Sequence, residues 1–318
     1  MLARREKQMA DPAVVNWLLE GDPAIRWQVM RDLLAAPPAR WQAEQRKVAR
    51  SGWGQRYLAL QDAAGTWGGG IYSPKWTSTT YTLLQLRDLG LPGANRAARR
   101  GARLALDGLL GQPGTPSFEH KLQHIDLCIA GMALSLEAYF DVRYAGGEAL
   151  LAHVMQHQMA DGGWNCRHKR DRHVVHSSFH TTFNVLDGLQ DQLDRGGPLG
   201  RRAIQAAQPR ATEFMLAHKL FRSDKTNAII SEHFLQLSYP PRWQYDVLRG
   251  LDYFRRIPAP RDARFGEAIE RVLSQRRDDG AWPAAQRHAG QEFFHLETGR
   301  QPSRWNTLRA LRVLQWWG

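Results

Sequence analysis

The amino-acid sequence is built from a repeated unit. Six segments share one design, in which a head of aromatic, hydroxyl-bearing or basic residues precedes a leucine-rich run with helical periodicity. The heads recur at intervals of 48 to 63 residues, a spacing that suits a helical hairpin and its connections. Residues that anchor the six heads are Trp27, Ser78, Asp126, His180, Trp243 and Trp305.

More polar, arginine-rich stretches lie between the leucine-rich runs. Their apolar residues recur every three or four positions, as Ile269, Val272 and Leu273 do, which indicates one buried stripe and one solvated face. No alternating strand pattern of comparable strength is present, so we predict an all-α protein. Six inner helices alternating with six outer ones close most simply into a ring, an α/α toroid, because closure leaves no repeat with an exposed apolar end.

Length and composition fit one large globular domain. The chain has 318 residues, of which 43% are hydrophobic and 23% charged, and we treat residues 1–318 as a single domain in which 1–20 could be a peripheral extension. No run of 18 apolar residues is present and the first residues do not resemble a secretory signal, which predicts a cytoplasmic protein. The two cysteines are too few for a disulfide scaffold and suit reduced thiols that can bind a metal.

The chain is strongly basic. A formal charge of +12 favours an anionic partner such as a diphosphate, a nucleic acid or an acidic membrane surface. The basic residues are mostly dispersed arginines, which is more typical of solvated helix faces than of a binding stripe. This dispersion disfavours nucleic-acid binding.

Three turns between outer and inner helices are variants of one pattern. They run from Gln61 to Trp67, from Gln158 to Trp164 and from Gln275 to Trp282, with Asp and Gly before the Trp. Asp and Gly suit a tight left-handed turn, Gln can bind freed backbone groups, and Trp can pack over the junction.

This pattern resembles the glutamine-tryptophan repeats of the terpenoid cyclase and protein prenyltransferase superfamily. A degenerate fourth copy lies at residues 114–118, so the resemblance covers most of the chain. It implies a toroid of helical hairpins and an apolar or isoprenoid substrate. The Asp-x-Asp-Asp motif of the cyclases and the aspartate-rich magnesium motif are both missing, which disfavours standard cyclisation.

Two motifs are similar to the zinc ligands of the prenyltransferase β subunits, which are an Asp-x-Cys at one inner helix and a His at the next. Asp126-Leu127-Cys128 fits the first, and Phe179-His180-Thr181 fits the second, one repeat later. The family's diphosphate-binding spacing is not reproduced around Lys121. The resemblance therefore supports a zinc site more than it supports protein prenylation.

The residue types by themselves also support a zinc site, without the family resemblance. Carboxylate, thiolate and imidazole all bind zinc, and three protein ligands leave the fourth position for water or substrate. Cys166 or His176 could complete the set or replace a member. The alternative gives each residue a structural role, with Asp126 as an N-cap, Cys128 as a core residue and His180 as a hydrogen-bonded core histidine.

We expect aromatic residues at the inner heads to ring a central cavity that suits a flat apolar or isoprenoid ligand. Arg242 and Arg304 occupy the same repeat position and could bind a diphosphate, or they could fix helix entry by stacking. The candidate lining residues are Trp27, Trp76, Tyr81, Phe179, Tyr245 and Trp305.

These observations favour a zinc-dependent enzyme of the cyclase and prenyltransferase superfamily. A toroid that binds a lipid or protein without catalysis is the second hypothesis. The third is a cyclase with an unfamiliar acid, in which Asp246 donates the proton and Tyr245 lies beside it as a further candidate catalytic residue.

Overall fold

The computed structural model describes residues 11–196, 199–257, 259–285, 287–297 and 301–318. Nearly all of the regular secondary structure in these residues is helical, which confirms the prediction of an all-α protein. The two short strands, β1 (Trp282–Pro283) and β2 (Pro302–Ser303), form an antiparallel pair next to the last helix. Residues 1–10 of the proposed N-terminal extension lie outside the described residues. The rest of it forms α1 (Pro12–Leu19), whose Val14, Val15 and Leu18 are buried.

Each leucine-rich run that the sequence predicts forms a helix. The caps explain where several of them begin, because Asp22, Ser178, Asp246 and Ser303 each accept a hydrogen bond from a first-turn backbone N–H. We call these the inner helices: α2 (Pro23–Asp32), α5 (Thr79–Leu89), α8 (Leu127–Tyr139), α10 (Phe179–Asp194), α12 (Val247–Arg256) and α14 (Arg304–Trp317).

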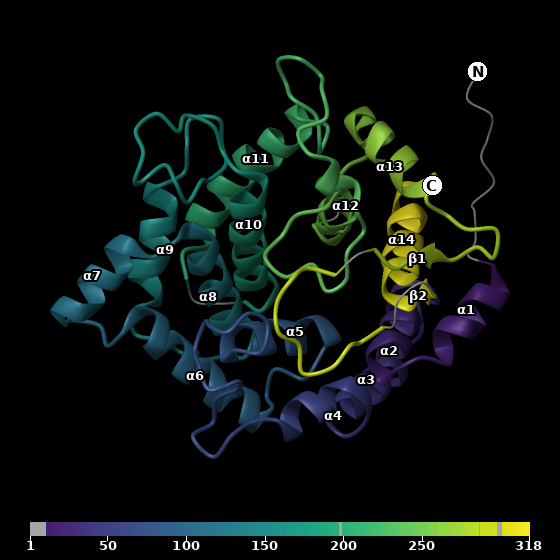
Figure 1. The fold of residues 1–318 in the computed structure, drawn as a ribbon, viewed down its shortest axis with the longest axis horizontal. Helices are drawn as coiled ribbons and strands as arrows, with labels where there is room; N and C mark the ends of the chain where they lie inside the picture. The colour runs from purple at the N-terminus through teal and green to yellow at the C-terminus, as the bar shows by residue number, and fades with distance from the viewer. Residues whose placement is uncertain (1–10, 197–198, 258, 286, 298–300) are drawn as a thin grey trace.

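The remaining helices lie between the inner ones in sequence. In Figure 1, several of them, including α6, α7, α9, α11 and α13, lie nearer the rim of the molecule than α5, α8, α10 and α12 do. They are α3 (Pro38–Gln45), α4 (Gly52–Ala59), α6 (Arg96–Leu110), α7 (Pro116–His124), α9 (Gly147–Gln156), α11 (Arg201–Ala217) and α13 (Gly266–Leu273), with 3₁₀ turns at Arg46–Ala49, Glu232–Leu235 and Ala263–Phe265. Helix α7 was not predicted, because the sequence pattern there was interpreted as a degenerate turn.

Neighbouring inner helices are in direct contact. The Trp27 indole N–H on α2 donates to the carbonyl of Leu89 at the end of α5, over 3.0 Å. Helices α8 and α10 cross at Gly131 and Gly188, where an added Cβ would lie 2.4 Å from the Asn184 carbonyl oxygen and 2.2 Å from the Gly131 carbonyl oxygen. Helix α14 contacts both α12 and α2, so the last inner helix lies against the first.

The three glutamine-tryptophan turns have the same hydrogen bonds at their tryptophans. Trp67, Trp164 and Trp282 are fully buried. Each indole N–H donates to a carbonyl ten residues earlier in the preceding outer helix, at 2.7 to 2.8 Å. Each tryptophan backbone N–H donates to a threonine hydroxyl on the following inner helix, at 2.9 to 3.0 Å. The acceptors are Thr79, Thr182 and Thr307.

The glutamine and glycine of the turns also behave as predicted. Gln61 and Gln158 donate to a carbonyl within their own turn and to a carbonyl of the next outer helix, at 2.7 to 2.9 Å. Gln275 instead reaches Leu235. Gly65, Gly162 and Gly280 have φ of +95°, +97° and +80°, a conformation that favours glycine.

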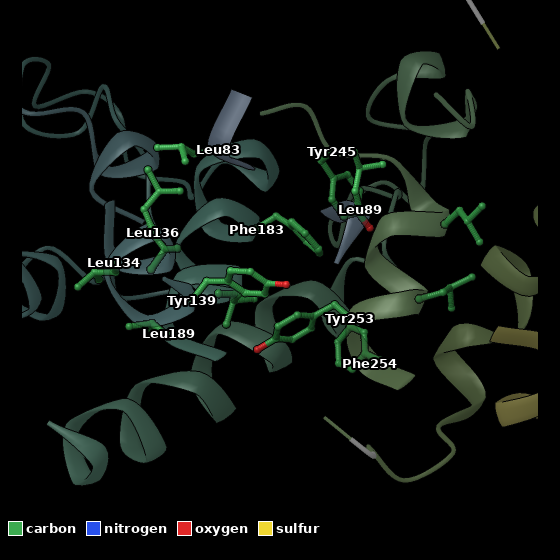
Figure 2. Packing of buried hydrophobic residues seen from close by; sticks show 14 of the residues in the cluster. Leu83, Leu89, Leu134, Leu136, Tyr139, Phe183, Leu189, Tyr245, Tyr253 and Phe254 are labelled. Carbon is green, nitrogen blue, oxygen red and sulfur yellow. The ribbon is translucent and has the colours of Figure 1, made fainter. Parts of the chain in front are cut away.

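The hydrophobic core fills the space between the helices. Figure 2 shows part of it, where Leu83, Leu136, Phe183 and Tyr253 contribute from α5, α8, α10 and α12. In the part of the chain that the structure describes, no helix is long and apolar enough to span a membrane.

We expect the threonine at each turn to contribute to stability. Replacing Thr182 with Val removes the acceptor of the buried Trp164 N–H and should lower the free energy of unfolding by about 1–3 kcal/mol, measured by urea denaturation. Thr182→Ser keeps the hydroxyl and should lose less. Thr212→Val is the matched control, because the Thr212 hydroxyl only bonds carbonyls of its own helix. Equal losses in the Val and Ser variants at position 182 would contradict this role.

Candidate functional site

A large cavity lies among the inner helices. It has a volume of about 590 Å³, which is in the range of small-molecule sites, and residues from all six inner helices line it. The last turns of α2, α5, α8, α10 and α12 contribute Asp32, Asp88, Tyr139, Asp194 and Arg256. The cavity is therefore concentrated toward the carboxyl ends of these helices.

Charged groups dominate its wall. Eight arginines and six aspartates line the cavity, together with seven aromatic residues. The arginines are Arg31, Arg87, Arg195, Arg249, Arg255, Arg256, Arg309 and Arg312, and the aspartates are Asp32, Asp88, Asp187, Asp191, Asp194 and Asp252. The aromatic residues are Trp27, Trp41, Tyr139, Phe183, Tyr239, Tyr253 and Trp305.

The buried carboxylates form ion pairs with arginines from other helices. Asp191 on α10 accepts from Arg87 of α5 at 2.9 Å and from Arg256 of α12 at 2.5 Å. Burial alone would raise the pKa of Asp191, but Arg256 and Arg87 together lower it below its ordinary value. Arg312 pairs with Asp252 and Asp32. Against the effect of burial, Arg312 lowers the pKa of Asp252, and Arg31 together with Arg312 lowers the pKa of Asp32.

One arginine of the cavity differs from the others. Arg195, at the end of α10, is exposed and has no acidic partner among the described residues. Its guanidinium lies 4.2 Å from the centre of the Tyr139 ring. Arg31 is also partly exposed, with its guanidinium over the Trp27 ring and an ion pair to the adjacent Asp32. Both guanidinium groups can bind an anion without leaving a deep carboxylate unpaired.

Aromatic pairs form the less polar parts of the wall. Tyr239 and Trp305 are stacked, with ring centres 4.3 Å apart and planes 15° apart. Trp27 and Trp41 are tilted relative to each other at 6.0 Å. Trp305 also stacks on Trp53, and Arg31 lies over the Trp27 ring, so neighbouring side chains already cover these ring faces.

The predicted lining residues divide into three groups. Trp27 and Trp305 line the larger cavity, while Tyr81 and Arg242 line a second cavity of only about 20 Å³. Trp76 packs edge to face with Tyr81 next to that second cavity.

Phe179 and Arg304 do not line either cavity. Phe179 is buried among Phe214, Phe234 and Tyr245. Arg304 donates to the carbonyl of Trp17 at 3.1 Å and lies over the Trp17 ring, so it connects α14 to α1. Arg242, the other arginine predicted to bind a diphosphate, pairs with Glu292 at 2.7 Å.

The predicted zinc ligands are engaged separately. Asp126 precedes α8 and forms an ion pair with Arg170. His180, on α10, accepts a hydrogen bond at Nδ1 from the backbone N–H of Tyr245, over 2.9 Å. Burial lowers the pKa of His180 to about 4, which keeps its imidazole neutral.

Only the two cysteines of the predicted set are in contact. Cys166 Sγ accepts from the backbone N–H of Cys128 at 3.4 Å and lies 3.3 Å from the hydroxyl oxygen of Thr181. Hydrogen bonding by Cys128 and Thr181 lowers the pKa of the Cys166 thiol to about 6, whereas contact with Cys166 and burial raise the pKa of the Cys128 thiol.

The donor groups do not form a ready zinc site. Among the described residues there is no group of three or more His, Cys, Asp or Glu side chains that could hold a metal ion. Asp126 would have to leave Arg170, and His180 would have to present its other nitrogen. His176, the further candidate, lies beside Lys225. Zinc binding stays a prediction.

The two candidate catalytic residues are buried. Asp246 caps α12 by accepting from the Arg249 N–H at 2.7 Å, and it pairs with Arg309 at 3.4 Å. Burial raises the pKa of Asp246 despite these partners. Tyr245 donates its hydroxyl to the Leu220 carbonyl at 2.9 Å. Neither residue lines the two cavities, and both have a structural partner.

The charged wall of the cavity is the feature that the sequence interpretation missed. Its signal was the placement of charges at the ends of leucine-rich runs, as in Arg31-Asp32, Arg87-Asp88 and Arg255-Arg256. Charges at these positions resemble ordinary solvated helix ends when the neighbouring helices are unknown.

Comparisons with models of protein families, with curated proteins and with solved structures give no match for this chain. The geometry of the cavity and of the thiol pair is therefore the basis for the functional argument.

The ion pairs in the cavity make a prediction about stability. Asp191→Asn removes one of the carboxylates that Arg87 and Arg256 share, while Asp187 remains, and should lower the free energy of unfolding at neutral pH by about 1–3 kcal/mol. Asp224→Asn, at an exposed site, should change it by less than about 0.5 kcal/mol.

The pH dependence checks the same interaction. Because the pKa of Asp191 is lower in the folded protein than in the unfolded chain, its stabilising effect is present above the unfolded pKa and is lost as the pH falls. The Asn variant should therefore lose less stability than the wild type below about pH 5, measured by denaturant unfolding at several pH values. Parallel pH profiles would contradict this assignment.

Proposed function

We propose that this protein is an α/α toroid that binds a small molecule with an anionic group in its central cavity. The observation that carries the proposal is the 590 Å³ cavity with an exposed arginine that lacks an acidic partner among the described residues. An isolated guanidinium beside aromatic rings is suited to a phosphate or a carboxylate.

The contacts between inner helices support the toroid. Helix α2 is bonded to α5, α8 crosses α10, α12 contacts α14, and α14 contacts α2. Ion pairs also join α10 to α12, the next inner helix. Arg249 and Arg256 of α12 pair with Asp187 and Asp191 of α10. A cavity lined from all six inner helices is the expected consequence of such an arrangement.

The charge distribution separates structural arginines from binding ones. Helix carboxyl ends carry partial negative charge, so arginines near them are stabilising even without a ligand. Arg87, Arg249, Arg256 and Arg312 also have carboxylate partners inside the cavity. Arg195 has only the Tyr139 ring among the described residues, which leaves its guanidinium available to a ligand.

The residues that line the cavity also indicate which class of ligand it suits. A hydrocarbon chain would have to desolvate the charged side chains of the wall without replacing their hydrogen bonds to water. A ligand with a polar or anionic group matches the guanidinium groups of the wall. Zinc-dependent chemistry on an isoprenoid, which the superfamily resemblance implies, is less well supported by this wall.

Binding of inorganic diphosphate tests the proposal. We expect wild-type protein to bind it in isothermal titration calorimetry, and Arg195→Ala to weaken the binding by about tenfold or more, since hydrogen bonds to charged groups contribute about 1.5–3 kcal/mol. Arg172→Ala is the matched control, because Arg172 is an exposed arginine outside the cavity.

Circular dichroism of each variant separates loss of binding from loss of fold. Absence of binding to the wild-type protein, or equal affinities of the Arg195 and Arg172 variants, would reject the cavity as an anion site. A phosphate monoester or a dicarboxylate in the same titration then distinguishes the kinds of anionic group.

A further inference from the structure

The two cysteines of the chain are neighbours in space although 37 residues separate them in sequence. Cys128 lies in the first turn of α8, and Cys166 lies in the connection between α9 and α10. The Cys166 sulfur lies 3.4 Å from the backbone nitrogen of Cys128, and both residues are half-buried. Thiol groups so placed can be joined by small movements of their side chains.

The surroundings of Cys166 favour it as the attacking sulfur. Its Sγ accepts from the Cys128 backbone N–H at the start of the 13-residue α8. The Thr181 hydroxyl, in the first turn of the 16-residue α10, lies 3.3 Å from the same atom. The amino end of α8 and the Thr181 hydroxyl therefore stabilise negative charge on this sulfur.

Positive charge is also present next to the pair. Lys169 donates to the Ile125 carbonyl at 3.3 Å, and Arg170 pairs with Asp126, so the segment after Cys166 is anchored beside the start of α8. The same segment carries Arg167 and Arg172, both exposed. A small disulfide with carboxylate groups would meet complementary charge as it approaches.

We propose that Cys128 and Cys166 form a dithiol site that undergoes thiol–disulfide exchange with an anionic low-molecular-weight disulfide. The proposal is independent of the cavity, because Cys128 lies in the first turn of α8 and Cys166 contacts that turn and the first turn of α10, whereas the cavity is concentrated toward the last turns of both helices. It gives these two cysteines a role other than zinc binding.

The exchange is balanced in two steps. The Cys166 thiolate attacks one sulfur of the small disulfide, forms a mixed disulfide and releases the first small thiolate, which takes up the proton that Cys166 gave to water. The Cys128 thiol then loses its proton, attacks the Cys166 sulfur and releases the second small thiol. Two protein thiols are oxidised to one internal disulfide, and one small disulfide is reduced to two thiols.

Oxidised glutathione is the probe for the test. Incubation of the reduced full-length protein should give an intact mass lower by two hydrogens, and peptide mapping should find a Cys128–Cys166 disulfide that dithiothreitol reverses. Cys128→Ser should stop at a mixed disulfide of Cys166, because the second attacking thiol is absent. Cys166→Ser should form its mixed disulfide at least about tenfold more slowly than Cys128→Ser does, since Cys128 lacks the donors around Cys166.

Circular dichroism and thermal melting show whether each variant is folded. The alkylation rate of the wild-type thiols by iodoacetamide provides a second measurement that needs no substitution, and Cys166 should be labelled first. A stable glutathione adduct on the wild-type protein, an unreactive native protein, or stoichiometric zinc that blocks both thiols would each overturn the proposal. Failure of diphosphate binding in the cavity would leave this result unaffected.

Discussion

The buried tryptophan of the glutamine-tryptophan turn is the interaction on which the rest of the structure depends. Its indole N–H holds the preceding outer helix, and its backbone N–H holds a threonine of the following inner helix. At two of the three turns a glutamine adds a bond to the next outer helix. Each such turn therefore fixes three helices at once, and because all of its donors are buried or nearly so, the cost of breaking any one bond is high.

The arrangement of helices that these turns fix determines where the thiol pair and the charged cavity lie. The two cysteines, Asp126 and His180 lie at or near the amino ends of α8 and α10, whereas the cavity is concentrated toward the carboxyl ends of α2, α5, α8, α10 and α12. The helix dipoles then favour thiolate at the first turn of α8 and arginine near the carboxyl ends. Two sites with different chemistry thus lie at opposite ends of the same helices.

Much of the fold could be predicted from the sequence, and less of the site. Helix periodicity and the turn pattern identified all six inner helices and the roles of Trp164, Gln158 and Gly162, because those interactions lie within about ten residues of each other. Helix α7 was missed because its sequence lacks a strong apolar stripe. Asp126 and Cys128 lie at the start of α8 and His180 lies at the start of α10, but Asp126 pairs with Arg170 and His180 accepts from a backbone N–H. Sequence spacing contains no information about those partners.

The sequence by itself determined a repeated all-helical chain with tryptophan turns, since periodicity, caps and tight turns are local properties of the polypeptide. Only the tertiary structure decided which charges meet and which thiols touch. Arg87 pairs with Asp191, which lies 104 residues later in the sequence, and Cys166 contacts Cys128 although helix α9 lies between them in the sequence. Such pairs form because the inner helices are neighbours in space. Their burial makes an unpaired charge too costly to keep, which is why each deep aspartate has an arginine beside it.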